Sequence, residues 1–204
     1  MRRTAMQARW LFLFGFALAL FTAFGCSNGG SVIVNQPALA CADGGAAAAN
    51  AVVMNCGGAT DSTTERVDVV MGGPAAGSTA LRGLNFDVTY DPAYLTFVSA
   101  TENTGGPFSV NALLLATALP NDPTPRVVVS IQQVSGDADV VIGAGQQVLM
   151  LHLTFTRAPG VTTFGATPLN FDAATSEATP PTPPTPPTLP TVVAFGGALG
   201  LSYQ

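Results

Sequence analysis

Short runs of alternating apolar and polar residues, broken by turn-forming clusters, restrict this chain to few kinds of fold. In "LNFDVTYDPAYLTFVSA", from Leu84 to Ala100, the alternation stops at Asp91-Pro92 and then resumes. A period of two places successive side chains on opposite faces of a strand, and proline has no N–H to donate to a neighbouring strand. We therefore predict one half-buried strand before Pro92 and another after it.

The same alternation predicts which side chains face a core. The apolar face of the first strand is Leu84, Phe86, Val88 and Tyr90. Its polar face is Asn85, Asp87 and Thr89. The second strand shares one face among Leu95, Phe97 and Ser99. Asp91, between the two strands, is expected to accept hydrogen bonds within the turn.

Comparable runs recur through residues 51–204. Clusters such as "GGPAAG", "TGGP" and "PNDPTP" separate them, and no long run of strong helix formers follows residue 30. Eight or so short strands at this spacing are typical of two packed antiparallel sheets. We predict an all-β, two-sheet antiparallel sandwich over residues 51–204.

The C-terminal part of this region contains a proline-rich segment, "TPPTPPTPPTLP". We place a proline-rich loop at residues 178–190, in the extended polyproline II conformation. It is either a stiff connector or a ligand for a proline-recognising domain. The following "TVVAFGGALGLSYQ" is too apolar to remain free in water, so we expect it to return to the sandwich and pair beside an early strand.

The N-terminus is organised like an export signal. Arg2, Arg3 and Arg9 precede the apolar "WLFLFGFALALFTAF", which is short for a membrane span and ends in small residues. We predict a signal peptide at residues 1–25.

The next residues indicate how the mature chain is held. The sequence "AFGC" resembles a bacterial lipobox, in which the cysteine, here Cys26, becomes the lipid-modified first residue. Cleavage by an ordinary signal peptidase, leaving Cys26 unmodified, is the alternative. We expect residues 26–50 to be a lipid-anchored tether and lead-in. The protein would be exported and attached to a bilayer at the bacterial outer membrane or cell surface, or else secreted.

Cysteine number supports this interpretation. The chain has three cysteines, and lipid on one of them leaves Cys41 and Cys56 as a pair. In an oxidising compartment we expect a disulfide between them, with two buried free thiols as the alternative. A zinc site that uses both and the single histidine, His152, would lack the necessary ligand number and spacing.

Charge and motif content exclude several functions. The formal net charge is −5, and all the basic residues are arginines, three of which lie in the predicted signal. Such an acidic chain is a poor partner for nucleic acid. The sequence contains no zinc-protease motif and no phosphate-binding glycine loop. We predict a protein that is not an enzyme and needs no cofactor.

Three polar residues are candidate site residues. His152 alternates with leucines and should point away from the core, and no partner for catalysis is evident. Asp137 and Asp139, in "SGDAD", are spaced as in some calcium loops. That segment lacks the glycine and glutamate of an EF-hand, so a polar turn is the other interpretation.

The strand pattern resembles the cohesin domain family and related carbohydrate-binding modules. The resemblance rests on "FDVTYDPAYLTFVSA", with its Tyr90-Asp91-Pro92 end and Leu95, and on the later strand that runs from Gly145 to Phe155. It covers about residues 51–204 and implies a jelly-roll sandwich. It also implies binding of a dockerin-type protein, in the extracellular degradation of polysaccharides.

The resemblance implies a partner-binding surface on the outer face of one sheet. Mapped onto this chain, that face comprises Asn85, Asp87, Thr89, Val128, Ser130, Gln132, Met150, His152 and Thr154. Dockerin-binding members often carry an acidic or amide pair early in the third strand. Here this pair would fall at Gly83 and Asn85, so one of the two is missing.

Two other functions stay open from the sequence. A direct carbohydrate-binding module would need exposed rings for sugar stacking. The only tryptophan, Trp10, lies in the predicted signal, which leaves Tyr94, Phe108 and Tyr203 as candidates. A structural envelope lipoprotein without a ligand is the third hypothesis.

Overall fold

The computed structural model describes residues 37–108, 111–134, 137–163, 165–181 and 193–204. The chain divides into two compact units, of which the second is Gln36–Gln204. The described residues form fifteen β-strands and no helix, so the prediction of an all-β fold is confirmed. Within these residues no helix could cross a membrane.

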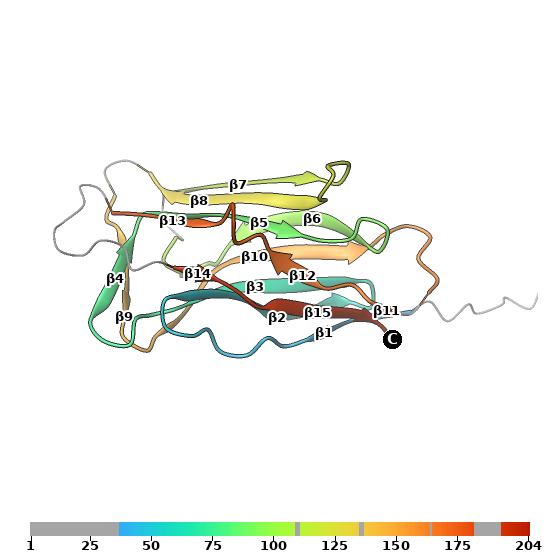
Figure 1. Ribbon diagram of the computed structural model, residues 1–204, viewed down its shortest axis with the longest axis horizontal. Helices are drawn as coiled ribbons and strands as arrows, with labels where there is room; N and C mark the ends of the chain where they lie inside the picture. Colours follow the sequence, from blue (N-terminus) through green and yellow to red (C-terminus); the bar gives the residue numbers. More distant parts are fainter. Residues whose placement is uncertain (1–36, 109–110, 135–136, 164, 182–192) are drawn as a thin grey trace, which may run out of the picture. The chain divides into compact units, whose positions relative to one another are not determined.

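The larger sheet contains eight strands (Figure 1). Six of them run in the order β1-β15-β12-β5-β8-β7, while β11 pairs with β15 and β13 pairs with β5. Their bounds are β1 Leu39–Ala42, β15 Ala198–Tyr203, β12 Leu169–Phe171, β5 Gly83–Thr89, β8 Arg126–Gln133, β7 Ala112–Leu119, β11 Gly165–Ala166 and β13 Glu177–Thr179.

The second sheet has five strands in the order β14-β2-β3-β10-β6. They are β14 Ala194–Phe195, β2 Ala51–Asp61, β3 Thr64–Gly72, β10 Gln147–Arg157 and β6 Leu95–Glu102. A two-stranded sheet joins β4, Ser78–Leu81, to β9, Val140–Gly143. Described pairs are antiparallel except β14 with β2, which is parallel.

The core lies between the two large sheets and follows the predicted alternation. Leu84, Phe86 and Val88 on β5 are at most 1% exposed. The ring of Tyr90 lies 5.8 Å from that of Phe155 on β10, so the two sheets meet through aromatic side chains. Each such side chain, fully buried, stabilises the fold by about 1.5–3 kcal/mol.

The turn after β5 also has the predicted chemistry. Asp91 Oδ1 accepts a hydrogen bond from the N–H of Ala93 at 2.9 Å, and its backbone carbonyl accepts one from Leu95 at 2.9 Å. This arrangement closes the turn before β6 begins, which is why the alternation resumes at Leu95.

The final apolar run returns to the sandwich, as predicted. β15 pairs with β1, β11 and β12, and β14 pairs with Ala51 and Val52 of β2. Phe195 is buried against Phe86 and Phe171, with ring centroids 6.2 and 5.5 Å apart. The last strand therefore lies inside the larger sheet, with partners on both sides.

Two predicted boundaries need correction. β1 lies within the predicted tether and lead-in, residues 26–50, so the sandwich begins before residue 51. The predicted proline-rich loop, 178–190, begins inside β13, because Ala178 and Thr179 pair with β5. Residues 182–190 lie outside the described residues, as do the predicted signal peptide and Cys26.

The disulfide between Cys41 and Cys56 is confirmed and ties β1 to β2. Its Cα atoms are 5.9 Å apart, and it closes a sequence separation of 15 residues. In the chain-entropy model a loop of this length is worth about 3 kcal/mol. The disulfide holds β1 against β2, because a strand of only four residues makes few contacts of its own.

Glu65, on the core-facing side of β3, is 3% exposed and pairs in register with Phe155. Burial raises the pKa of its carboxyl above the usual value, and a hydrogen bond from the N–H of Gly58 opposes this only in part. The folded state therefore binds the Glu65 proton more tightly than the unfolded chain does. The protonated carboxyl contributes stability at low pH, and this stability is lost as pH rises above about 4.5.

We expect Glu65→Gln to raise the free energy of unfolding at neutral pH, because the amide keeps an acceptor for Gly58 and carries no charge to bury. Urea denaturation at a series of pH values is the measurement. The wild-type protein should lose stability relative to the variant as pH rises from 4.5. Parallel pH profiles for the two proteins would contradict this assignment.

Candidate functional site

The outer surface of three neighbouring strands forms the candidate site, here called the β5–β8–β7 face. Pairing aligns Asn85 with Ser130 and Ser130 with Leu115, so side chains from the three strands lie in rows across the sheet. The outward residues are Asn85, Asp87 and Thr89 of β5, Arg126, Val128, Ser130 and Gln132 of β8, and Leu113, Leu115 and Thr117 of β7.

Asn85 is the centre of a hydrogen-bond network on this face. Its Oδ1 accepts hydrogen bonds from Ser130 Oγ at 2.7 Å and Gln132 Nε2 at 3.3 Å. Its Nδ2 donates to Glu177 Oε1 at 3.4 Å and to Thr179 Oγ1 at 3.3 Å, both on β13. The amide is thus held in one orientation, and the polar side chains around it are fixed in advance.

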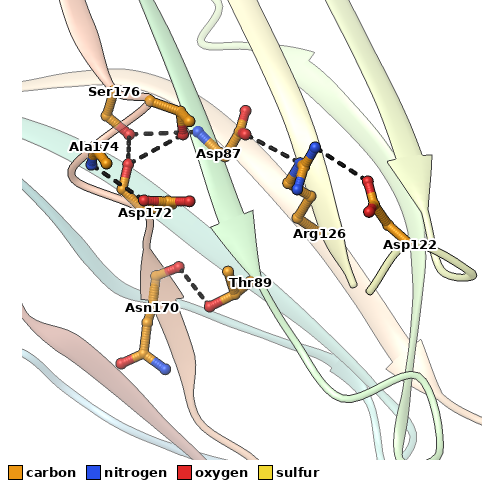
Figure 2. Close-up of polar contacts among 9 residues, drawn as sticks. Asp87, Thr89, Asp122, Arg126, Asn170, Asp172, Ala174 and Ser176 are labelled. Atoms are coloured by element: carbon orange, nitrogen blue, oxygen red, sulfur yellow. Dashed lines mark hydrogen bonds and ion pairs between the residues drawn. The ribbon is translucent and has the colours of Figure 1, made fainter. Parts of the chain in front are cut away.

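A second network begins at Asp87, which is 7% exposed. Arg126 Nε lies 3.2 Å from Asp87 Oδ2, and Arg126 Nη2 lies 3.0 Å from Asp122 Oδ2. Figure 2 shows the guanidinium between the two carboxylates. This arrangement joins β5, β8 and the turn after β7.

On its other side, β5 is fastened to β12 and to the segment that follows β12 (Figure 2). The backbone N–H of Asp172 donates to the carbonyl of Asp87 at 2.9 Å, and Ser176 Oγ donates to the carbonyl of Asp172 at 2.7 Å. Thr89 Oγ1 likewise donates to the carbonyl of Asn170 at 3.2 Å. Asp87 is therefore a structural brace beneath the rim of the face, with little surface for a partner.

Three apolar side chains are exposed on this face. Leu113, Leu115 and Val128 are 56, 58 and 37% exposed. The two leucines are two residues apart on β7. Val128 lies on β8, two residues from Ser130, which pairs with Leu115. We call these three residues the apolar stripe. A contiguous exposed apolar surface with a polar border is typical of an interaction site.

Five of the six residues predicted for the partner surface lie on one face, and the sixth lies in the other large sheet. Asn85, Asp87, Thr89, Ser130 and Gln132 come together as expected. The predicted placement of His152 on this face is wrong, because β10 belongs to the five-stranded sheet; Met150 and Thr154, predicted beside it, lie on the same strand. Alternation within a strand does not reveal which sheet the strand joins.

The side chain of His152 is largely covered and lies against an aspartate. Its Nδ1 lies 2.7 Å from Asp68 Oδ1 on β3, and the side chain is 15% exposed. Arg66 Nε lies 3.4 Å from the same carboxylate oxygen. Neighbouring side chains thus cover most of the ring.

Sequence reasoning missed the apolar stripe and Arg126. In "ALLLATAL" both faces of the strand are apolar or small, so no alternation marks Leu113 and Leu115 as outward. Arg126 becomes informative only when pairing places it near Asp87, 39 positions away in sequence. The only sequence signal for this exposed strand was the length of the β7 run and its lack of charged residues.

The two aspartates spaced as calcium ligands make other contacts. Asp139 Oδ1 lies 3.3 Å from Arg82 Nη1, which also approaches the carbonyl of Asp137 at 3.4 Å. Asp137 Oδ1 accepts a hydrogen bond from Asn111 Nδ2 at 3.5 Å. Among the described residues, no cluster of three or more histidine, cysteine or acidic side chains could hold a metal ion.

The three aromatic rings that could stack on a sugar are largely packed against other side chains. Phe108 is fully buried, and Tyr203 is 3% exposed. Tyr203 donates its hydroxyl to the carbonyl of Tyr94 at 2.5 Å, and burial raises the pKa of Tyr203 to about 12. The ring of Tyr94 lies 6.3 Å from that of Tyr203. These three rings provide no flat platform for a sugar.

Comparison with known proteins rests on structure. No model of a known protein family matches this sequence, and no curated protein does. One match is CaCohA2, in a crystal structure of its complex with a CaDoc0917 variant. The two chains are 14% identical with a TM-score of 0.50, and the match covers 72% of this chain and 94% of CaCohA2. The fold is cohesin-like.

Two further solved structures match with lower TM-scores. The solution structure of CaCohA2 from Clostridium acetobutylicum is 15% identical, with a TM-score of 0.49 over 72% of this chain and 87% of its own. A cohesin in a type I cohesin–dockerin complex from Clostridium thermocellum is 12% identical, with a TM-score of 0.47 over 78% of this chain and 94% of its own.

Proposed function

We propose that this protein is a non-catalytic binding module that holds a dockerin-type protein on the β5–β8–β7 face. The observation that carries the proposal is the apolar stripe, exposed beside polar side chains that are already fixed by one another. Burial of exposed leucine and valine supplies affinity, and a fixed polar border supplies specificity. The cohesin-like fold supports the choice of partner.

The proposal places the partner over Leu113, Leu115 and Val128, with Ser130 and Gln132 at the border. It leaves Asp87 and Arg126 as supports of the face. In this view the departure from the family pattern at Gly83 matters little, because a Cβ there would meet the backbone of β8 and a side chain would have no room. The partner would belong to a system that degrades extracellular polysaccharide.

We expect the double variant Leu113→Ala, Leu115→Ala to bind a dockerin module at least about 100-fold more weakly, since buried anchors at an interface centre cost 2 kcal/mol or more each. The matched control is Val141→Ala on β9, which is 64% exposed and lies in the separate two-stranded sheet. Both variants should melt like the wild type, and calorimetric titration measures the affinities.

Removal of calcium provides a second test of the proposed partner. A dockerin needs calcium to hold its fold, so a chelator should abolish capture of a dockerin. Equal affinities for the double variant and the Val141→Ala control would reject the face. Retention on a polysaccharide without any protein partner would instead support a carbohydrate-binding module.

We also propose that the protein is exported and lipid-anchored through Cys26. The disulfide between Cys41 and Cys56 supports this address, because such bonds persist mainly in oxidising compartments. Two or three acyl chains would make a lasting anchor. Intact-mass analysis of the mature chain is the test, and an N-terminal residue without acyl mass would refute the anchor.

A further inference from the structure

The edge formed by β7 differs from the other edges of the two large sheets in the described chain. β1 and β14 have four and two residues, and the N–H of Leu39 on β1 donates to the carbonyl of Ser62 at 2.9 Å. β6 carries Glu102, and its register with β10 is shifted. β7 has eight residues without charge, proline or glycine, and its register with β8 is unbroken. Natural edges are normally short, charged or interrupted, because an open edge can pair with another chain.

The hydrogen bonds around β8 reveal which β7 groups are open. On the β5 side, the N–H of Gln133 donates to the carbonyl of Arg82. On the β7 side, the N–H of Val134 donates to the carbonyl of Asn111. Bonding alternates along an antiparallel pair. Leu113, Leu115 and Thr117 therefore bond to β8. The residues that direct N–H and C=O groups away from β8 are Ala112, Leu114, Ala116 and Ala118.

We propose that β7 pairs with β7 of a second copy of this chain, antiparallel and about a two-fold axis at Leu115. The open residues lie symmetrically about Leu115, so this axis sets Ala112 opposite Ala118 and Leu114 opposite Ala116. Each of these pairs is hydrogen-bonded. Leu115 then faces Leu115 of the copy, and Leu113 faces Thr117.

A second copy fits this edge for physical reasons. The two edges are identical in length and in phase, and neither carries a charge, so no like charges oppose each other on an acidic chain. Aliphatic residues meet on the outer side, where Leu113 and Leu115 are exposed in the single chain. The pairing would continue the larger sheet across the axis and place two apolar stripes side by side. This inference is independent of the partner proposed above.

Self-association can be measured on residues 36–204, a unit that contains both sheets, their core and the disulfide. A contact through one edge is small, so we expect a dimer that forms between about 1 and 200 µM in sedimentation equilibrium. Ala116→Pro removes an N–H that β8 does not use, so the variant should keep its far-UV spectrum and remain monomeric. A wild-type protein that stays monomeric, or a folded Ala116→Pro variant that dimerises equally, would overturn the proposal.

Cross-linking tests the register and does not depend on the proline variant. Leu115→Cys would place two thiols in a non-hydrogen-bonded pair, where Cα atoms are about 4.5 Å apart and a disulfide can form. The matched control is Leu113→Cys, because Leu113 is almost equally exposed but faces Thr117 of the copy. Mild oxidation should yield the Leu115→Cys dimer at least about 10-fold faster, as read on a non-reducing gel. Equal rates for the two variants would reject the two-fold axis at Leu115.

Discussion

Deletion of residues 193–204 should abolish cooperative unfolding. The deletion removes β14 and β15, and with β15 it removes the partner that joins β1 to β12 in the larger sheet. The deleted core residues are Phe195, Leu199, Leu201 and Tyr203. At about 1.5–3 kcal/mol for each buried side chain, their loss is comparable to the 5–15 kcal/mol that stabilises a typical domain.

Point variants of β15 separate loss of packing from loss of chain length. Leu201 is fully buried, whereas Ser202 next to it is half-buried on the opposite side of the strand. Leu201→Ala should lower the free energy of unfolding by about 2–5 kcal/mol, and Ser202→Ala should change it by less than about 0.5 kcal/mol. Thermal melts followed by circular dichroism measure both. A truncated protein that still melts cooperatively near the wild-type temperature would show that β15 is dispensable.

Asp87→Arg should destabilise the protein by at least about 3 kcal/mol, because it removes the buried partner of Arg126 and sets a second guanidinium beside it. The sequence pattern places Asp87 on the outward polar face of its strand, but the structure shows that this side chain is only 7% exposed. The charge swap Asp87→Arg, Arg126→Asp should recover part of the loss. Urea denaturation provides the free energies.

Asp122→Ala is the matched control for Asp87. Asp122 binds the same guanidinium, but its side chain is 27% exposed, so its removal should cost less than about 1 kcal/mol. If Asp122→Ala were as damaging as Asp87→Arg, or if the charge swap recovered nothing, Asp87 would have no bracing role.

Much of the fold was predictable because its determinants are local. The alternation around Leu84 and Leu95 requires only neighbouring residues, and the pairing of Cys41 with Cys56 follows once Cys26 is set aside. β1 was missed because "LACA" lies among alanines and glycines without a period. Its strand conformation depends on β15, more than 150 residues later in the chain.

The candidate site was less predictable, because its features arise from pairing between distant segments. Alternation correctly turned Asn85 and Asp87 outward, but only the docking of residues 170–179 beside β5 shows that one of them is buried. His152 alternates in the same way, although it lies in the other sheet. Exposure of Leu115 follows from the edge position of β7, which a single sequence does not encode locally.

Methyl-resolved NMR titration with a dockerin module reports on the proposed face in the intact domain. Two sets of exposed strand methyl groups can be compared: Leu113, Leu115 and Val128 on the β5–β8–β7 face, and Val98 and Val141 on other sheets. Saturable shifts or broadening confined to the first set are expected, because those side chains become buried in the complex. Shifts confined to Val98 and Val141, or no shift at saturating partner, would contradict the assignment of this face as the protein-binding surface.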